Sequence, residues 1–498
     1  MQKVLTCAQM RAADKYTIQE LGVASQVLME RAGAAIAEET EKLLQETGGT
    51  SVLAVCGGGN NGGDGWCAAR LLLEKGYRAA VFTLTDILSP DCAAQREKFA
   101  GEVFSSFPEE KFDVVIDAVF GTGFHGAPEG RFADAVKRIN GCAARVVSAD
   151  IPSGLNGDDG SFVSCVNADV TVAVGELKVG HLIGNGPDVC GKTVRKDIGI
   201  EVTAPPFAEL CEGADFVKFF PPRKKNTHKG TFGRAAILAG SRLYTGAPLL
   251  SAAAALRCGC GYTQLCVPEE MYPYYIGKLP EAILTAAPSE NGALRADGEF
   301  LRSLAANAGS VAVGMGCGVS RALYDCVAML LSEYSGTLVL DADALGALAA
   351  YGVDILKEKS CRVVLTPHLK EFSRLCGKSV EEVAKNGPAL AKQFAAEYGA
   401  VVLLKSHTCF VTNGRVGRFI TEGTPALAKG GSGDVLSGIV AALAARGISA
   451  ADSAACAAFL LGRAGRFAAE YPSNEYSATA TDVIACLPRA VTSLMRGE

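Results

Sequence analysis

Nine residues, Gly430 to Gly438, restrict the fold of this chain more than any other stretch, and they read GGSGDVLSG. Glycines and a serine run directly into Asp434, and the apolar residues that follow have helical spacing, so a glycine loop should end where a helix begins. Glycines let the backbone approach a phosphate closely, and a helix N-terminus carries partial positive charge. The stretch therefore predicts an anion site suited to phosphoryl transfer.

Asp434 is the unusual residue of this loop, because a carboxylate beside an anion site repels the ligand unless it serves the reaction. One interpretation is that Asp434 accepts a proton from a substrate hydroxyl. The other is that Ser432 or Asp434 only caps the helix, since Gly, Ser and Asp are common N-cap residues. The loop by itself leaves both interpretations open.

The composition suits α/β domains. Of 498 residues, 49% are hydrophobic and 20% are charged, with 57 Gly and one Trp, which is unlike a disordered chain or a coiled coil. A chain of this length should hold about two to four domains. The net charge of -5 and the pI near 5.8 argue against a general nucleic-acid surface, so no nucleic-acid partner is expected.

No targeting segment is expected at the start of the chain. Only Val4 and Leu5 precede the return of polar residues, unlike a signal peptide, and no apolar run approaches the roughly 18 residues of a membrane span. We therefore expect a soluble, cytoplasmic protein with no membrane partner. The 18 cysteines are scattered singly through apolar segments, which indicates reduced core residues rather than disulfides or metal ligands.

The N-terminal half begins with two expected helices, residues 9–21 and 27–43, followed by a buried strand at 51–56. The glycine-rich loop Gly57 to Gly65 comes next, and a helix is expected from Trp66 to Glu74. A strand, a glycine loop and a helix present a phosphate site at the carboxyl edge of a parallel sheet. The loop does not match GxGxxG, and its two asparagines and Asp64 indicate that side chains also contact the ligand.

Further strands of this half are expected at residues 79–84, 112–121, 145–154 and 168–175. Two of them end in a carboxylate before glycine, Asp117 and Asp150. In an open parallel sheet these ends and the Asn60 to Asp64 loop meet at one crevice. The alternative for Asp117 is that it caps the next turn.

The strand and helix pattern breaks down between residues 201 and 226, where two proline pairs occur, and we place the domain boundary there, between residues 212 and 213. Alternation of strands and helices then resumes, beginning with a strand at 235–239. The fold class is therefore α/β, with two doubly wound domains at residues 1–212 and 213–498.

Five groups of residues stand at the expected strand ends of the second half: Gly314 to Gly318, Asp341 with Asp343, His368 with Glu371, Lys405 to Thr408, and the Gly430 loop. Lys405, Ser406 and Thr408 are suited to phosphate binding, although a lysine at a strand end can also extend along the surface to solvent.

Two of these groups have metal-binding alternatives. His368 and Glu371 are one helical turn apart and should face the same pocket, but nothing nearby supplies the third ligand that zinc prefers. Asp341 has the chemistry to hold a substrate hydroxyl or a hydrated Mg²⁺, while Asp343 can instead cap the following helix.

Motifs in both halves resemble the NAD(P)H-hydrate repair family. The N-terminal part resembles the hydrate epimerases through LMERAG, GGGNNGGDG, DAVFGTG and DIPSGLNGDDG. The C-terminal part resembles the ADP/ATP-dependent hydrate dehydratases through HKGTFGR, AGSRLYTGA, LDADAL, TPHLKEF and GGSGDVLSG. The resemblance implies a Rossmann-like and a ribokinase-like domain. It also implies epimerisation of (R)- and (S)-NAD(P)HX, and dehydration of (S)-NAD(P)HX to NAD(P)H with release of phosphate and, from ADP, AMP.

Site residues follow from the resemblance, position by position. For the epimerase it implies Asp150 as the catalytic residue and a hydrate site made of Asn60, Asn61, Gly62, Gly63, Asp64, Gly121, Thr122, Gly123, Phe124, His125, Gly126, Ala127 and Asp150. It implies a potassium site of Asn61, Asp117 and Ser153. For the dehydratase it implies Asp434 as the base, a hydrate site of Ala247, Gly316, His368 and Asp434, and a nucleotide site of Lys405, Ser406, His407, Thr408, Cys409 and Gly433.

The implied ligands are NADHX, NADPHX, ADP or ATP, K⁺ for the epimerase and Mg²⁺ for the dehydratase, and the chain is expected to form a homo-oligomer. Two positions depart from the family pattern: Gly346 replaces an asparagine, and Ser432 replaces a threonine. The motif LKSHT also differs from the common LKGAxT, which places His407 near the nucleotide.

Two other functions fit parts of the chain. A ribokinase-like small-molecule kinase fused to a binding module would explain the Gly430 loop, and a noncatalytic nucleotide sensor would explain a nucleotide site. The polar crevice of the N-terminal half favours the repair function over the kinase, and Asp434 favours an enzyme over the sensor.

Overall fold

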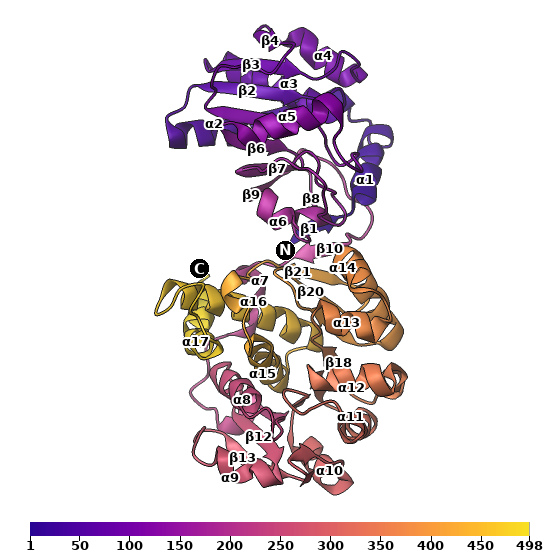
Figure 1. Ribbon diagram of the computed structural model, residues 1–498, viewed down its shortest axis with the longest axis vertical. Coiled ribbons are helices and arrows are strands. Elements are labelled where there is room, and N and C mark those ends of the chain that lie inside the picture. The colour runs from indigo at the N-terminus through magenta and orange to yellow at the C-terminus, as the bar shows by residue number, and fades with distance from the viewer. Residues whose placement is uncertain (498) are drawn as a thin grey trace. The chain divides into compact units, whose positions relative to one another are not determined.

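The computed structural model describes residues 1–497, and its chain divides into two compact units. The N-terminal unit is Gln2–Ala208, and the C-terminal unit holds the chain from Glu209 onward together with Met1. In Figure 1 the first unit is drawn in indigo and purple, and the second runs from magenta through orange to yellow. The division falls inside the proline-rich segment 201–226.

The N-terminal unit is built on a seven-stranded sheet in which all neighbouring strands are parallel. The strands, in spatial order, are β4 (Glu102–Phe104), β3 (Arg78–Thr83), β2 (Ser51–Cys56), β5 (Val114–Ala118), β6 (Arg145–Ala149), β7 (Val170–Val174) and β9 (Lys192–Lys196). The chain winds outward from β2 in one direction and from β5 in the other. The sheet is therefore doubly wound, with its switch point between β2 and β5.

Strand β2 shows how the apolar pattern builds two cores. Val52, Ala54 and Cys56 pack on one face of the sheet, while Leu53 and Val55 pack on the other. Side chains alternate along a strand, so a continuous apolar run is the pattern of a strand covered on both faces. The helices are α1 (Cys7–Gln19), α2 (Ser25–Thr47), α3 (Asn60–Glu74), α4 (Pro90–Lys98), α5 (Gly130–Gly141) and α6 (Gly186–Val189), and β1 (Gln2–Leu5) pairs with β8 (Leu177–Lys178) outside the main sheet.

The expected helix start at Trp66 is wrong, because α3 begins at Asn60 inside the glycine-rich stretch. A Cβ at Gly62 would lie 2.0 Å from the Gly57 carbonyl oxygen, and one at Gly65 would lie 2.5 Å from the Ala118 Cβ. These glycines therefore serve close packing of the first helical turns rather than loop flexibility. Two earlier helices also begin two residues sooner than expected, and for α1 the reason is a capping box between Thr6 and Gln9.

The C-terminal unit contains a ten-stranded run of paired strands. In spatial order these are β13 (Ile283–Ala287), β12 (Tyr262–Pro268), β11 (Arg234–Leu238), β16 (Ser310–Val313), β17 (Thr337–Leu340), β18 (Arg362–Leu365), β19 (Val401–Leu404), β20 (Cys409–Thr412), β21 (Gly417–Ile420) and β10 (Ala208–Leu210). From β13 to β19 the neighbours are parallel, and β20 is antiparallel to both of its neighbours. This sheet is also doubly wound, with its switch point between β11 and β16.

Helix α15 (Ser432–Ala445) is the most deeply buried helix of this unit, since every residue from Val435 to Ala445 is buried. It packs against α8 (Gly246–Arg257) and the sheet, and the Ser310 hydroxyl of β16 donates to the Ala441 carbonyl at 2.6 Å. The remaining helices of eight residues or more are α10 (Gly298–Asn307), α11 (Arg321–Glu333), α12 (Asp343–Tyr351), α13 (Leu369–Cys376), α14 (Val380–Tyr398), α16 (Ala450–Glu470) and α17 (Ala480–Arg496).

Two sequence-based expectations concern the whole chain. All 18 cysteines are free, and most are buried, as expected for reduced core residues. Within residues 1–497, every helix is too short or too polar to cross a lipid bilayer.

Candidate active sites

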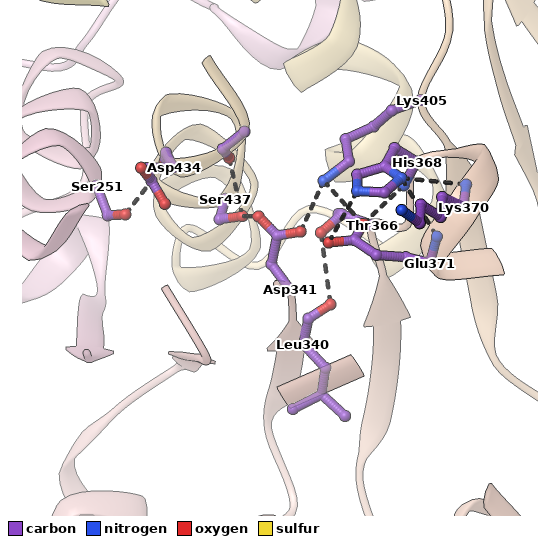
Figure 2. A network of polar contacts seen from close by, with 11 residues as sticks. Ser251, Leu340, Asp341, Thr366, His368, Lys370, Glu371, Lys405, Asp434 and Ser437 are labelled. Atoms are coloured by element: carbon purple, nitrogen blue, oxygen red, sulfur yellow. Dashed lines mark hydrogen bonds and ion pairs between the residues drawn. The ribbon is translucent and has the colours of Figure 1, made fainter. Parts of the chain in front are cut away.

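Asp434 lies in the first turn of α15, at the carboxyl edge of the C-terminal sheet. Gly431 is the N-cap residue, with φ +97°, and no side chain caps this helix. The capping interpretation of Ser432 and Asp434 is therefore wrong. Among residues 1–497 the Asp434 carboxylate has no hydrogen-bond partner, whereas its backbone carbonyl accepts a bond from the Ser251 hydroxyl at 2.9 Å (Figure 2).

The surroundings of Asp434 prepare it to accept a proton. Burial raises the pKa of this carboxyl to about 6, and the negative charges of Asp341 and Asp343 act in the same direction, while Lys405 opposes them. A pKa near 6 leaves the carboxylate ionised at neutral pH yet basic enough to take up a proton, which is the requirement for a general base.

Asp341 connects α15 to the strand ends. Its carboxylate accepts a bond of 2.8 Å from Lys405 Nζ and one of 2.6 Å from the Ser437 hydroxyl (Figure 2). Asp341 is 1% exposed, so both partners are needed to compensate its burial. Lys405 is drawn inward by this carboxylate, and the alternative of a lysine extending to solvent is wrong.

His368 and Glu371 meet, but not on one helix as expected. His368 is the N-cap residue of α13, and its Nδ1 accepts bonds from the amides of Lys370 at 3.1 Å and Glu371 at 3.2 Å. The Glu371 carboxylate accepts a bond of 2.8 Å from the His368 amide and lies 3.6 Å from Lys405 Nζ. Glu371 of this capping box therefore contacts Lys405, which in turn is bonded to Asp341.

Asp343 does not cap α12. Its carboxylate accepts a bond of 2.8 Å from the Gly318 amide, which holds the loop after β16 against the end of β17. Gly346, on the same helix, faces Val319: a Cβ at Gly346 would lie 2.7 Å from Val319 Cγ2. A larger residue at position 346 would have to displace Val319, so the Gly346 departure has a local packing reason.

The other residues implied for the dehydratase fall into two places. A Cβ at Gly316 would lie 3.2 Å from Ala247 Cβ, so these two hydrate-site residues are neighbours. A Cβ at Gly433 would lie 3.5 Å from Lys405 Nζ, so these two nucleotide-site residues are neighbours. The rest of the implied nucleotide site is the turn from β19 to β20, formed by Ser406, His407, Thr408 and Cys409.

The N-terminal unit has a cavity of about 580 Å³ at the carboxyl edge of its sheet, next to the switch point, which we call the N-terminal pocket. Its polar and loop lining includes Arg11, Asp14, Asn60, Asn61, Asp64, Gly121, Thr122, Gly123, Phe124, Asp150 and Lys178. Gly62 and Gly63 do not line it, because they serve helix packing, and neither do His125, Gly126 and Ala127.

Asp150 follows β6 and has a left-handed backbone, with φ +65°, which is uncommon for a residue with a side chain. Its carboxylate forms an ion pair with Lys178 Nζ and accepts a bond of 3.3 Å from the Val174 amide. His181 Nε2 lies 3.0 Å from the Asp150 carbonyl oxygen, and His181 Nδ1 accepts from the Lys178 amide, so Nε2 carries the proton. Asp150 is thus held through both its backbone and its side chain.

Asp64 and Asp14 line the same pocket without a partner among the described residues 1–497. Burial raises the pKa of Asp64 well above its ordinary value, and the carboxylates of Asp150 and Asp14 raise it further. Burial also raises the pKa of Asp14. The pocket therefore combines a paired carboxylate at Asp150 with carboxyl groups that favour their protonated form.

Of the residues implied for potassium, Asn61 lines the pocket, whereas Asp117 and Ser153 are buried outside its lining. The Asp117 carboxylate is fully buried and accepts bonds from the Ser148 hydroxyl at 2.8 Å, the Ser153 amide at 2.8 Å and the Ser153 hydroxyl at 2.5 Å. It also accepts a longer bond of 3.4 Å from the Val119 amide, as the turn-capping alternative expected. Both polar atoms of the Asn61 amide are buried without a partner in the described part of the chain. An amide oxygen without a partner and a buried carboxylate are ligand types that suit a hard cation.

Sequence reasoning missed Lys178, His181, Asp14 and Ser437. Lys178 sits in the apolar stretch LKVGHLIG, and its side chain is 1% exposed. A charged residue flanked by apolar residues on a short strand is a usable signal, because a lysine is almost never fully buried unless it is paired. Asp14 and Ser437 carry no comparable signal, since each lies on a helix with ordinary spacing.

Both halves of the chain match known protein families, and single relatives match nearly its whole length. A family described as NAD(P)H-hydrate dehydratase matches residues 235–489, and a family described as YjeF-related protein N-terminus matches residues 25–180. A bifunctional NAD(P)H-hydrate repair enzyme from Thermofilum pendens is 35% identical, over 99% of this chain and 97% of the relative. The corresponding enzyme from Moorella thermoacetica is 34% identical over the same shares.

Among solved structures, the chain is similar to an ADP/ATP-dependent NAD(P)H-hydrate dehydratase from Bacillus subtilis that was co-crystallised with ATP and Mg²⁺. The two are 26% identical, with a TM-score of 0.50, and the match covers 58% of this chain and 99% of that one. Nearly the whole of that ribokinase-like dehydratase therefore matches a part of this chain.

Proposed function

The chain belongs to the family of bifunctional NAD(P)H-hydrate repair enzymes, and from this premise we propose that residues 1–212 carry the epimerase and residues 213–498 carry the dehydratase. The two family matches, at residues 25–180 and 235–489, lie on either side of this boundary and support it. The enzyme epimerises NAD(P)HX and uses an adenine nucleotide to return (S)-NAD(P)HX to NAD(P)H.

The observation that carries the dehydratase half is the unpartnered Asp434 carboxylate in the first turn of α15. Asp434 removes the proton from the hydroxyl on C6 of the hydrate, and the hydroxyl oxygen attacks the terminal phosphorus of ADP or ATP. The bridging bond of the nucleotide breaks, releasing AMP or ADP. The C6–O bond then breaks with release of phosphate, and loss of the C5 proton restores the double bond of NAD(P)H.

The nucleotide is assigned to Lys405, Ser406, His407, Thr408, Cys409 and Gly433, and the hydrate to Ala247, Gly316, His368 and Asp434. The B. subtilis relative crystallised with ATP and Mg²⁺ supports a nucleotide with magnesium in this unit. Three carboxylates, at Asp341, Glu371 and Asp434, surround a single Lys405, and this excess of negative oxygen suits a magnesium ion shared with phosphates. Magnesium would neutralise charge on the phosphates during transfer.

The epimerase half uses the N-terminal pocket, with Asp150 as its catalytic residue. Asn61, Asp117 and Ser153 are assigned to K⁺, on the strength of the unpartnered Asn61 amide beside the switch point. Bound K⁺ would offset the buried charge of Asp117, whose pKa is raised by burial.

Potassium should therefore raise the thermal stability of the isolated fragment 1–212, and Asp117→Asn should abolish the difference in stability between potassium and tetramethylammonium salts.

A homo-oligomer is expected from the family, and light scattering of the purified chain tests it. A cytoplasmic location is expected because NAD(P)H and adenine nucleotides are used there, and cell fractionation tests it.

The central test is recovery of absorbance at 340 nm from prepared NADHX by the purified chain, with ADP, with ATP and with neither. Recovery that requires a nucleotide supports the function. Phosphorylation of the hydrate without recovery of NADH would instead support the ribokinase-like kinase, an alternative disfavoured because relatives named as repair enzymes match both halves of the chain.

A further inference from the structure

We propose that Asp64 and Asp150 are the acid and the base of the epimerisation, and that the buried Lys178 is a positioning residue that holds the Asp150 carboxylate toward the pocket. This inference rests on the epimerase function proposed above. In this assignment Asp150 acts on the hydroxyl oxygen of the substrate, Asp64 acts on its ring nitrogen, and Lys178 acts on Asp150.

The ion pair of Lys178 and Asp150 is built into the fold. Lys178 ends β8, its side chain is 1% exposed, and its Nζ donates to the Val174 carbonyl at 2.8 Å as well as contacting the Asp150 carboxylate. Asp150 keeps 15% of its side chain exposed toward the pocket. The lysine is therefore sealed behind the carboxylate, and the carboxylate is the member of the pair that meets the ligand.

Asp64 has the opposite environment in the same pocket. It comes from α3 on the other side of the switch point and has no hydrogen-bond partner or cation among residues 1–497. Burial disfavours the ionised form of Asp64 most strongly, the Asp150 and Asp14 carboxylates act in the same direction, and only the charge of Lys178 opposes them. A carboxylate paired with a buried cation, facing a second carboxyl group whose ionised form is disfavoured, is a usual arrangement of a base and an acid.

The substrate chemistry requires both groups. C6 of the hydrate bears a hydroxyl and is bonded to the ring nitrogen, so it changes configuration if the ring opens and closes again. Asp150 takes the hydroxyl proton, the O–H electrons form the carbonyl of an aldehyde, and the C6–N1 bond breaks with its electron pair going to N1. Asp64 supplies the proton that N1 then needs.

Ring closure reverses these transfers. After rotation about the C5–C6 bond, N1 attacks the other face of the aldehyde. N1 returns its proton to Asp64, and Asp150 returns its proton to the oxygen. No proton or electron is gained or lost overall, so the step needs no nucleotide and no redox partner.

Other titratable and charged groups surround the pair. Facing Asp150 or Asp64 are Cys7 and Asp14 of α1, Cys56 of β2, Cys92 of α4, Lys178 of β8 and His181 of the turn after β8. Burial raises the pKa of Cys7 to about 12 and of Cys92 to about 11, and burial lowers the pKa of His181 to about 4. Near neutral pH these three groups are uncharged, and Asp14, whose pKa is also raised by burial, is the remaining carboxyl group that the experiment must separate from Asp64.

The experiment follows exchange of the two NADHX epimers by chromatography, with the full-length chain and no nucleotide, so that the dehydratase is silent. Asp64→Asn and Asp150→Asn should each slow exchange by about 10² to 10⁴. Asp86→Asn is the matched control, because Asp86 is 89% exposed, pairs with Arg96 at 3.2 Å and lies outside the pocket lining. It should exchange at the wild-type rate.

The pH profile separates chemistry from structure. The wild-type rate should fall at alkaline pH, where Asp64 is ionised. Asp64→Asn should lose this alkaline limb, whereas Asp14→Asn should keep it. Lys178→Met should lower kcat by tenfold or more with little change in KM, because the Asp150 carboxylate loses the partner that holds it toward the substrate, and Lys178→Arg should recover part of the rate. An unchanged alkaline limb in an active, folded Asp64→Asn variant, or an unchanged kcat in Lys178→Met, would overturn the proposal.

A double variant covers the case in which Lys178→Met does not fold. The variant that combines Lys178→Met with Asp150→Asn removes both charges of the ion pair, so neither is left buried without its partner. It should exchange the epimers no more slowly than Asp150→Asn alone, since the lysine serves the reaction through Asp150. A further loss of tenfold or more in the double variant would show an independent role for Lys178 and overturn the assignment. If the wild type itself exchanges the epimers no faster than buffer, the epimerase function fails rather than the acid–base assignment.

Discussion

At the scale of single residues, this chain shows how position decides what an aspartate does. Asp341 and Asp434 lie on the same sheet edge, yet Asp341 is bonded to Lys405 and Ser437 while Asp434 has no bonded partner among the described residues. The first is suited to holding structure and charge in place. The second is suited to moving a proton.

Asp434→Asn should keep nucleotide binding and lose dehydration by about 10² to 10⁴ in rate, because an amide does not accept the hydroxyl proton. The wild-type rate should fall as the pH drops below about 6, where the Asp434 carboxylate becomes protonated. Initial rates at 340 nm and nucleotide titration calorimetry measure the two effects. Asp325→Asn, which alters a surface pair with Arg321, is the control. Near-normal turnover of Asp434→Asn would refute its role as the base.

The same substitution should stabilise the fold at neutral pH. The folded state raises the pKa of Asp434 from 3.8 to about 6, so it binds the proton more tightly than the unfolded chain does. Ionisation therefore opposes folding as the pH rises from 3.8 to about 6, and the cost is complete above that range. Asp434→Asn should gain about 1 to 3 kcal/mol at pH 8 and almost nothing at pH 4, measured by urea unfolding. An equal gain at both values would contradict the shift.

At the scale of elements, the two glycine stretches prepare helix starts in different ways. Gly431 supplies a left-handed N-cap before α15, which leaves Asp434 free in the first turn. In α3 the glycines are inside the helix, where Gly62 packs against the Gly57 carbonyl and Gly65 packs against Ala118. The first device exposes a carboxylate, and the second brings a helix N-terminus close to the strand before it.

Gly62→Ala should therefore destabilise the N-terminal unit by about 1 to 3 kcal/mol, because its Cβ would lie 2.0 Å from backbone that cannot move away easily. Gly59→Ala is the matched control, since a Cβ there meets nothing within 4 Å and its φ is −88°. It should change stability by no more than about 0.5 kcal/mol. Thermal unfolding of fragment 1–212 followed by circular dichroism measures both. Equal effects of the two substitutions would show that α3 does not depend on this close approach.

At the scale of the whole molecule, each unit has its own core and its own doubly wound sheet, with its candidate site at the carboxyl edge of that sheet. A dehydratase site that fixes the hydroxyl between Asp434 and a phosphate accepts one configuration at C6, because transfer must be in line. The other epimer has its hydroxyl directed away. The epimerase then supplies the epimer that the dehydratase consumes.

Asp150→Ala in the full-length chain should give biphasic recovery of 340 nm absorbance from an epimer mixture with nucleotide, a fast phase and then a slow one. The wild type should give a single fast course. Adding fragment 1–212 should restore that course, because refilling requires only diffusion. Rapid, complete conversion by the variant alone would show either that the dehydratase accepts both epimers or that Asp150 is not the epimerase residue.

The sequence alone was enough for the fold class, for most strands and for the residues at their ends. Apolar runs of strand length, glycine stretches after them and helical spacing are local patterns, and they predicted β2 to the residue and α15 as a helix that opens at a glycine loop. Asp150 and Asp341 were found because parallel strands bring their carboxyl ends to one edge, and Asp434 was found because it follows a glycine loop at the start of a helix.

Only the tertiary structure decided which of these residues are paired, buried or free. Lys178 is 28 residues from Asp150, and Lys405 is 64 residues from Asp341, so no local pattern joins them. The start of α3 at Asn60 depends on contacts with Gly57 and Ala118 that sequence propensity does not contain. Local patterns record backbone preference and burial, whereas a charge state or a close approach depends on neighbours that folding brings from elsewhere in the chain.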